Sequence, residues 1–96
     1  MSNAATIDEA GFRAALARDG YEAVDRSLPP GPPGTEHTHP FDARLLILEG
    51  AFTLARGGQS TTYRPGDIFE VPAGQPHAET PGPDGTRYIA GRRHKG

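Results

Sequence analysis

The chain has 96 residues, a formal charge of −2, a hydrophobic content of 34% and no cysteine. This length supports one domain with a thin core, so a single domain is expected over residues 1–96. The absence of cysteine excludes disulfides and thiolate ligands, and leaves His, Asp and Glu as metal ligands. With no strong positive field, no apolar run of membrane-spanning length and no secretion signal, we expect a cytoplasmic protein without nucleic-acid or membrane partners.

The first predicted element is one N-terminal α-helix, running from about Ile7 to Arg18 within residues 6–19. Thr6 and Glu9 have the spacing of a capping box, in which each side chain satisfies a free backbone N–H at the helix start. Gly20 is placed to end the helix in a left-handed conformation. The apolar face of this helix consists of Phe12, Ala15 and Leu16. We therefore expect the helix to pack against the rest of the domain.

From about residue 21 to 91, short β-type runs alternate with turns rich in glycine and proline, which predicts an all-β barrel or sandwich. The expected strands lie near residues 21–28, 35–41, 43–49, 51–56, 59–63, 68–71, 76–80 and 86–91. The run at 81–85, Pro-Gly-Pro-Asp-Gly, is one of the predicted turns. Residues 92–96 form a short basic tail that we expect to be solvated, and its His94 is not a predicted ligand.

The segment 29–34, Pro-Pro-Gly-Pro-Pro-Gly, has two interpretations. Its composition is typical of polyproline ligands that dock on another domain. It also suits a stiff loop that leads into the histidines at 37 and 39. We favour the loop, because the segment directly precedes those histidines.

Three histidines form the predicted metal site. His37 and His39 are two residues apart in an extended segment, so both rings leave the same face, about 6.5–7 Å apart along the strand. His77 follows a turn at 72–74 that can reverse the chain and bring it alongside. Three imidazoles and a solvent molecule suit one divalent metal ion, and zinc, iron, nickel, copper and cobalt all remain open.

The spacing around these histidines resembles the two sequence motifs of the cupin family. The first motif runs from His37 and His39 to Gly50. The second includes Gly66, Pro72, Gly74 and His77. Together they cover residues 34–77, nearly half of the chain. The resemblance implies a cupin jelly-roll β-barrel preceded by the N-terminal helix, with a metal in the mouth of the barrel.

In the family this metal is bound by the histidine pair, a glutamate four residues later and the histidine of the second motif. Ala43 stands at the glutamate position here, so the usual anionic ligand is missing. Asp42 does not replace it, because strand alternation turns its side chain to the opposite face. An asparagine sometimes follows the second-motif histidine by four residues, and that position is Pro81.

Glu79 is the predicted catalytic residue, because it lies two residues after His77 and leaves the strand on the same face. It is expected to replace part of the lost carboxylate, either as a fourth ligand or as a base acting on metal-bound water or substrate. Two alternatives stay open: a salt bridge to Arg87 on the following strand, and a solvent-facing position at the barrel rim.

Two classes of function follow. One is a metal-dependent small-molecule enzyme of the dioxygenase, isomerase or lyase type found in this superfamily. The other is a non-catalytic module that binds or senses a metal or small ligand in the same cavity. The fold itself does not decide between them. A third alternative is a cupin that has lost its metal and keeps buried, hydrogen-bonded histidines.

The same strand alternation bears on assembly. If His37 and His39 face the cavity, residues 43, 45 and 47 also face inward, and Leu46 and Leu48 face outward. These leucines need cover from the helix or from another subunit. Because cupins commonly pair through such sheets, the sequence predicts a homodimer.

Overall fold

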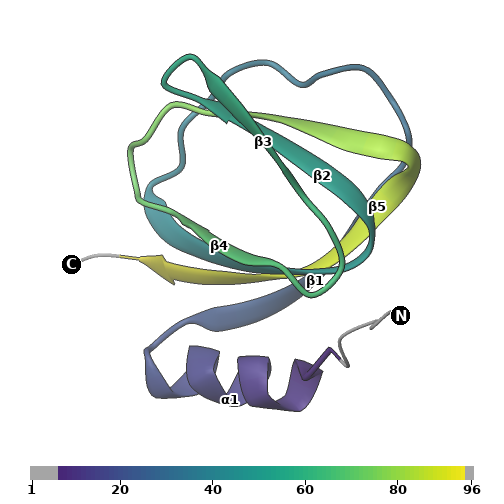
Figure 1. Cartoon of the computed structure of the whole chain (residues 1–96). Helices are drawn as coiled ribbons and strands as arrows, with labels where there is room; N and C mark the ends of the chain where they lie inside the picture. Colours follow the sequence, from purple (N-terminus) through teal and green to yellow (C-terminus); the bar gives the residue numbers. More distant parts are fainter. Residues whose placement is uncertain (1–6, 95–96) are drawn as a thin grey trace.

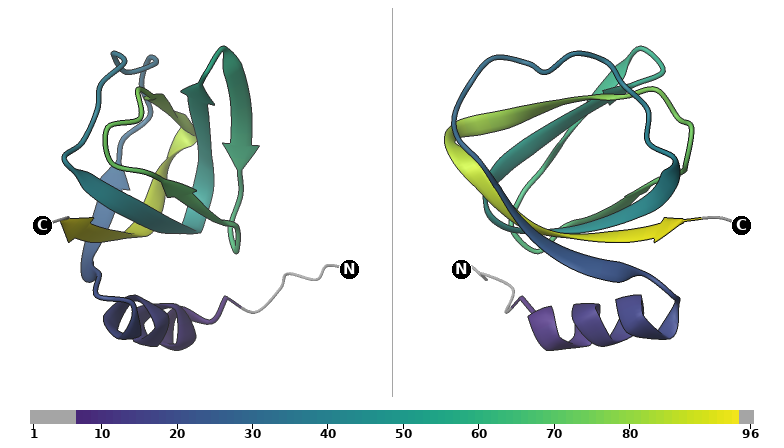
Figure 2. Two further views of the ribbon diagram at one scale, coloured as in Figure 1. Left: turned by 90° about the vertical axis from the view of Figure 1, so that its left-hand side faces the viewer. Right: turned by 180° about the vertical axis from the view of Figure 1, so that it is seen from behind.

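The computed structural model describes residues 7–94. Its elements are α1 (Glu9–Arg18), β1 (Glu22–Leu28), β2 (Phe41–Arg56), β3 (Gln59–Tyr63), β4 (Ile68–Val71) and β5 (Ala78–His94). The strands pair antiparallel in the order β1-β5-β2-β3, and β4 pairs with β2. The sheet curls into a barrel, and α1 lies outside it beside β1 (Figures 1 and 2). The predicted all-β barrel with one N-terminal helix is confirmed.

Two long bent strands replace four of the predicted short ones. The expected strands at 43–49 and 51–56 are parts of β2, and those at 76–80 and 86–91 are parts of β5. The predicted turn at 81–85 is wrong: Gly50 pairs with Thr86 while Phe52 pairs with Pro81, so residues 82–85 bulge within β5. Such a bulge bends the strand pair without breaking it.

The expected strand at 35–41 is also absent as an element. Within the described residues this segment contributes only an isolated bridge between His37 and His77, and β2 begins at Phe41. The extended conformation that the sequence predicts there is therefore local to the histidines. The proline-rich residues before them form a loop with no regular secondary structure.

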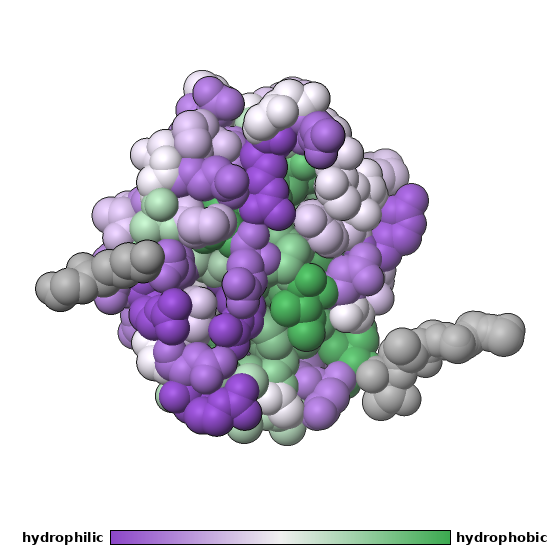
Figure 3. Space-filling model, turned by 60° about the vertical axis from the view of Figure 1, so that its left-hand side comes forward, coloured by the Kyte–Doolittle hydropathy of each residue, from purple (hydrophilic) through white to green (hydrophobic). Residues whose placement is uncertain are grey.

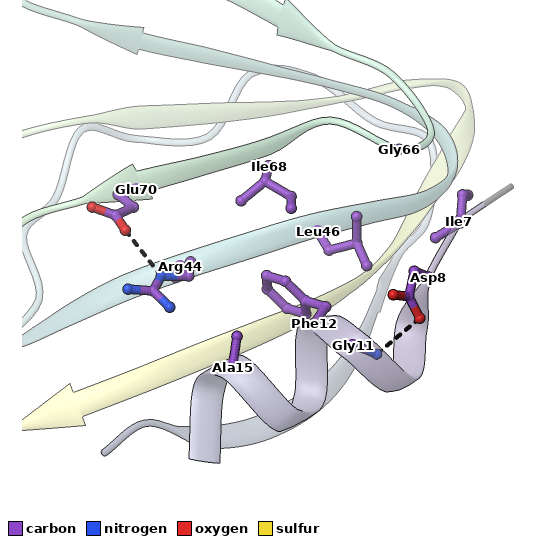
Figure 4. Close-up of a pocket in the computed structure, with 10 residues that line it drawn as sticks. All are labelled: Ile7, Asp8, Gly11, Phe12, Ala15, Arg44, Leu46, Gly66, Ile68 and Glu70. Carbon is purple, nitrogen blue, oxygen red and sulfur yellow. Dashed lines mark hydrogen bonds and ion pairs between the residues drawn. The ribbon is translucent and has the colours of Figure 1, made fainter. Parts of the chain in front are cut away.

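The helix ends follow local hydrogen bonding. Thr6 of the predicted capping box lies outside the described residues, and Glu9 is the first helical residue, so the expected start at Ile7 is two residues too early. Asp8 is the N-cap, and its carboxylate accepts a hydrogen bond of 2.9 Å from the amide of Gly11 (Figure 4). At the other end Gly20 has a φ of 83°, as predicted. Tyr21 N–H donates to the carbonyl of Leu16, which completes a Schellman cap.

Two apolar clusters lie on opposite faces of the sheet. The cluster inside the barrel consists of Ala43, Leu45, Ile47, Phe52, Leu54, Phe69, Val71, Tyr88 and Ala90. The outer cluster consists of Phe12, Leu16, Tyr21, Leu46, Leu48 and Ile89. The predicted alternation in β2 is thus confirmed, and α1 is the cover for Leu46 and Leu48. Burial of each such leucine contributes about 1.5–3 kcal/mol to folding.

The basic C-terminal segment is not a free tail. Residues 92–94 belong to β5, where Arg92 pairs with Ala43 and Arg93 with Asp42. The guanidinium of Arg93 also lies 3.2 Å from the Asp42 carboxylate. The predicted solvated tail is therefore wrong for 92–94, because strand pairing and this ion pair hold them, while 95–96 lie outside the described residues. No helix within residues 7–94 is long and apolar enough to span a membrane.

Candidate metal centre

Backbone hydrogen bonds bring the two histidine segments together. The amide of His37 donates to the carbonyl of His77 at 2.9 Å, and the amide of His77 donates to the carbonyl of His37 at 3.0 Å. The amide of Gly74 donates to the carbonyl of His39 at 2.9 Å. The main chain therefore places the second-motif segment directly beside the first. The predicted reversal of the chain at 72–74 is wrong: Val71 pairs with Ala43 and His77 with His37, so the chain runs antiparallel to the first segment on both sides of this turn.

The three imidazole rings form a nearly equilateral triangle. Their centroids lie 4.8 Å apart for His37 and His39, 4.5 Å for His37 and His77, and 4.9 Å for His39 and His77. Nδ1 of His37 lies 2.8 Å from the carbonyl oxygen of Thr35, and Nδ1 of His77 lies 2.9 Å from that of Gln75. A carbonyl only accepts, so Nδ1 carries the proton and Nε2 keeps its lone pair. Two of the three rings are thus held in a tautomer that can bind a metal through Nε2.

Glu79 completes the group. Its Oε2 lies 3.5 Å from Nε2 of His77, which is buried. Ligand atoms of His37, His39, His77 and Glu79 all lie within 4.8 Å of one another. The alternative salt bridge to Arg87 does not form, because Arg87 instead pairs with Glu49 at 2.9 Å. Three neutral nitrogens and one carboxylate are a donor set that suits the divalent metals named above.

The family model for the cupin domain matches residues 25–88, which include the histidines and Glu79. The chain belongs to the cupin family. Among curated proteins, none matches the sequence significantly.

Solved cupin structures agree with the fold. A cupin superfamily protein from Desulfitobacterium hafniense DCB-2 is 23% identical with a TM-score of 0.69, over 80% of this chain and 70% of that one. KdgF from Halomonas sp. is 26% identical with a TM-score of 0.64, over 79% and 72%. The DMSP lyase DddQ from Ruegeria pomeroyi DSS-3 is 26% identical with a TM-score of 0.70, over 80% of this chain but only 40% of that one.

The neighbouring residue Asp42 does not supply the carboxylate that the cupin motif would place at position 43. Ala43 lies inside the barrel. The Asp42 carboxylate faces away from the histidines, where it accepts hydrogen bonds from the amide of Ala73 and from Arg93. His94 is not part of the metal group either, and its ring lies 5.3 Å from that of Phe41. Glu79 is the carboxylate that the described residues place at this site.

Two cavities open beside the metal group. A small one of about 90 Å³ has His39, Glu79 and Ala43 in its wall, together with Arg26, Tyr88 and Arg92. Sequence reasoning missed these last three residues. The signal was present for two of them, since Tyr88, Ala90 and Arg92 alternate on one strand and share a face. Burial raises the pKa of Tyr88, and the nearby Glu79 raises it further, so the phenol stays protonated near neutral pH.

A second cavity of about 400 Å³ lies on the other side of Glu79 and His37. Much of its wall is the proline-rich loop, with Pro29, Pro30 and Pro32 lining it. This placement agrees with a stiff loop that leads to the histidines. The cupin site is thus bounded by a cavity of mixed polarity at the inner face of the sheet and a more apolar one under the loop.

The environment of His39 leads us to expect that the stability of the metal-free cupin depends on pH. Its pKa is lowered from the ordinary value of 6.5, first by burial and then by the charges of His77, His37 and Arg92. Because the unfolded chain takes up this proton at a higher pH than the folded one, stability should fall as pH drops below about 6.5. Urea unfolding in EDTA at several pH values measures this dependence. His39→Gln should flatten it and His94→Gln should not; an unchanged slope in His39→Gln would contradict the prediction.

Proposed function

We propose that this cupin domain binds one divalent metal ion through His37, His39 and His77 and acts there on a small molecule. The observation that carries the proposal is the convergence of these rings with Glu79, all with ligand atoms within 4.8 Å. A bound ion would supply Lewis-acid polarisation of a ligand oxygen. The residues of the chain would supply the rest: Nδ1–H bonds orient two rings, and Glu79 accepts a proton from a group held beside His77.

An enzyme is the proposal we favour. A similar solved structure is a lyase, although this chain spans less than half of that protein. The site also offers the carboxylate of Glu79 and the neutral phenol of Tyr88, which line one cavity and can serve as a base and an acid. The alternative is a module that binds or senses a ligand without catalysis. It is supported by the small number of acid–base groups, because Glu79 is the one carboxylate that the described residues bring to the metal group. Turnover of a bound ligand by the metal-loaded protein would separate the two.

Elemental analysis tests the metal directly. The protein should be produced without a chelating tag and without added metal, and then analysed for the first-row transition metals. We expect about one ion per chain, lost on dialysis against EDTA and restored by zinc or iron(II). Purified protein that neither contains nor takes up a divalent metal would contradict the proposal and leave the histidines as a hydrogen-bonded structural cluster.

Glu79→Gln separates two roles of this carboxylate. If Glu79 is a direct ligand, the neutral amide should weaken metal affinity by more than the roughly 10–100-fold typical of groups that only support a ligand. If it is a base beside the ion, metal content should stay at the wild-type level while the pH profile of activity loses its acidic limb. Metal titration and a pH–rate profile make the measurement. Glu49→Gln, a surface carboxylate paired with Arg87, is the matched control. A variant unchanged in both measurements would remove Glu79 from the mechanism.

The homodimer expected from the sequence stays a prediction, but the structure points to a different surface for the contact. Leu46 and Leu48 are covered by α1, but Ile68 on β4 is 55% exposed. It borders a groove of about 530 Å³ between α1 and β4 (Figure 4), and apolar surface is visible among polar side chains in Figure 3. We expect a second copy to cover this groove. Light scattering at micromolar concentration should give a dimeric mass that Ile68→Asp reduces to a monomer; a monomeric wild type would refute the dimer.

A further inference from the structure

Three side chains on the inner face of the sheet, Arg26, Tyr88 and Arg92, line the small cavity and do not belong to the metal group. Arg26 on β1 is the direct register partner of Tyr88 on β5. Arg92 lies four residues beyond Tyr88 on the same strand, and therefore on the same face. Their side chains line one cavity with His39 and Glu79. Two cationic groups and a hydroxyl from two neighbouring strands thus point into a space that borders the metal group.

Neither Arg26 nor Arg92 forms an ion pair with an acidic residue among residues 7–94. Within the described residues the ion pairs of arginine involve Arg13, Arg18, Arg44, Arg87 and Arg93. Arg26 and Arg92 form none, and the guanidinium of Arg92 instead lies 5.1 Å from the centre of the Phe41 ring. Arg92 is half-buried, so its charge is partly withdrawn from water without a fixed counter-ion. An anionic ligand would supply that counter-ion.

Tyr88 points to the same conclusion. Its side chain is only 6% exposed, and among residues 7–94 no hydrogen bond is formed by its hydroxyl. In the described part of the chain, every fully buried side-chain polar atom has a hydrogen-bond partner. The Tyr88 hydroxyl has none, so it is not fully buried and opens onto the cavity that Tyr88 lines. A protonated phenol facing this small cavity is a hydrogen-bond donor without an acceptor among the described residues.

We propose that this cavity binds the carboxylate of a small organic acid, with Arg26 and Arg92 as charge partners and Tyr88 as hydrogen-bond donor. A planar guanidinium matches the two oxygens of a carboxylate. The volume of about 90 Å³ equals that of about three water molecules, which is room for a carboxylate and one adjacent substituent. The short side chain of Ala43, directly opposite Arg92 in the sheet, keeps this space open.

The inference deepens the proposed function and rests on it for the position of the substrate. A carboxylate held by Arg26 and Arg92 would present its neighbouring carbon to Glu79 and His39, because these side chains line the same cavity. Glu79 is the one acidic residue in that lining, so the wall carries a net positive charge before any metal is added. The substrate class is therefore a small carboxylic acid.

Calorimetric titration of the full chain tests the carboxylate site, with glycolate as the probe and the neutral glycolamide as its isostere. We expect glycolate to bind at least 10-fold more tightly than glycolamide. Arg92→Gln and Arg26→Gln should each weaken glycolate binding by 10-fold or more, and Tyr88→Phe by several-fold. Arg87→Gln is the matched control, because this guanidinium pairs with Glu49 and does not line the cavity. Zinc content should be the same in all four variants.

The titrations are run on zinc-loaded and on EDTA-treated protein, so that the two proposals fail separately. Glycolate binding that depends on Arg92 in protein unable to hold zinc would refute the metal and support the carboxylate site. Protein that binds zinc but has equal affinity for glycolate and glycolamide would support the metal site and refute the carboxylate site. Wild-type glycolate affinity in both arginine variants would overturn the carboxylate site, as would tighter binding of inorganic phosphate than of glycolate. Arg26 is exposed on an edge strand, so its variant should fold even if Arg92→Gln does not.

Discussion

His77→Ala should lower the metal content of the purified protein from about one ion per chain to nearly none. The ring is almost fully buried at the centre of the group, where its Nε2 lies beside Glu79. Its removal leaves two imidazoles, and we expect affinity to fall by at least about 100-fold, more than the 10–100-fold typical of lost supporting groups. Elemental analysis after dialysis, and competition with a chelator of known affinity, measure the loss.

The main chain makes this variant interpretable. The two hydrogen bonds between residues 37 and 77 are formed by backbone atoms, so alanine retains them. Circular dichroism and urea unfolding should therefore show a folded protein. His94→Ala is the matched control, since this histidine lies at the end of β5 and outside the metal group. Full metal content in His77→Ala, or equal loss in His94→Ala, would refute the proposed ligand set.

Gly50→Ala should be the most destabilising of the conservative substitutions considered. Gly50 has a φ of 77°, and a Cβ there would overlap the carbonyl oxygen of Gly85 on the facing strand. The left-handed conformation costs a non-glycine residue about 1–2 kcal/mol, and the steric overlap adds about 1–3 kcal/mol. The free energy of unfolding should fall by about 2–5 kcal/mol, a large part of the 5–15 kcal/mol typical of a domain.

Gly58→Ala measures the free-energy cost of the left-handed backbone conformation without the steric overlap. Gly58 has a similar φ of 79°, but nothing lies within 4 Å of a Cβ built on it. It should therefore lose only about 1–2 kcal/mol. Urea unfolding of both variants gives the difference, which reports the close approach of β2 and β5. Equal destabilisation would show that the two strands can separate at this bend without cost.

The sequence predicts the fold class well because its signals are local. Alternation in residues 43–48 assigns each side chain to its face, and Gly20 marks the helix end. The strand boundaries are less accurate where tertiary pairing overrides local signals. The segment 81–85 has the composition of a turn, yet pairing of its flanks with β2 keeps it within β5 as a bulge. Arg92 and Arg93 look like a solvated tail until the partners Ala43 and Asp42 are known.

The histidine group was predictable for the same reason. His37 and His39 share a face through strand periodicity, and the cupin motif supplies the link to His77. Glu79 follows from parity with His77. Arg26 carries no such signal, because its place in the cavity depends on the pairing of β1 with β5, which joins residues far apart in the chain. Short-range periodicity finds one strand's contribution to a site, and the contributions of other strands need the sheet order.

The central place of β5 in the sheet governs the order in which the protein can fold. β5 separates β1 from β2, so the N-terminal strand has no partner among the described strands until the last one is available. Glu22 pairs with Arg92, which lies far along the sequence, and the entropy cost of closing so long a loop before stabilising contacts form makes such topologies slow to fold. On the ribosome, β1 must wait, unpaired, until residues 86–92 have left the exit tunnel. The barrel therefore closes only after β5 has been made.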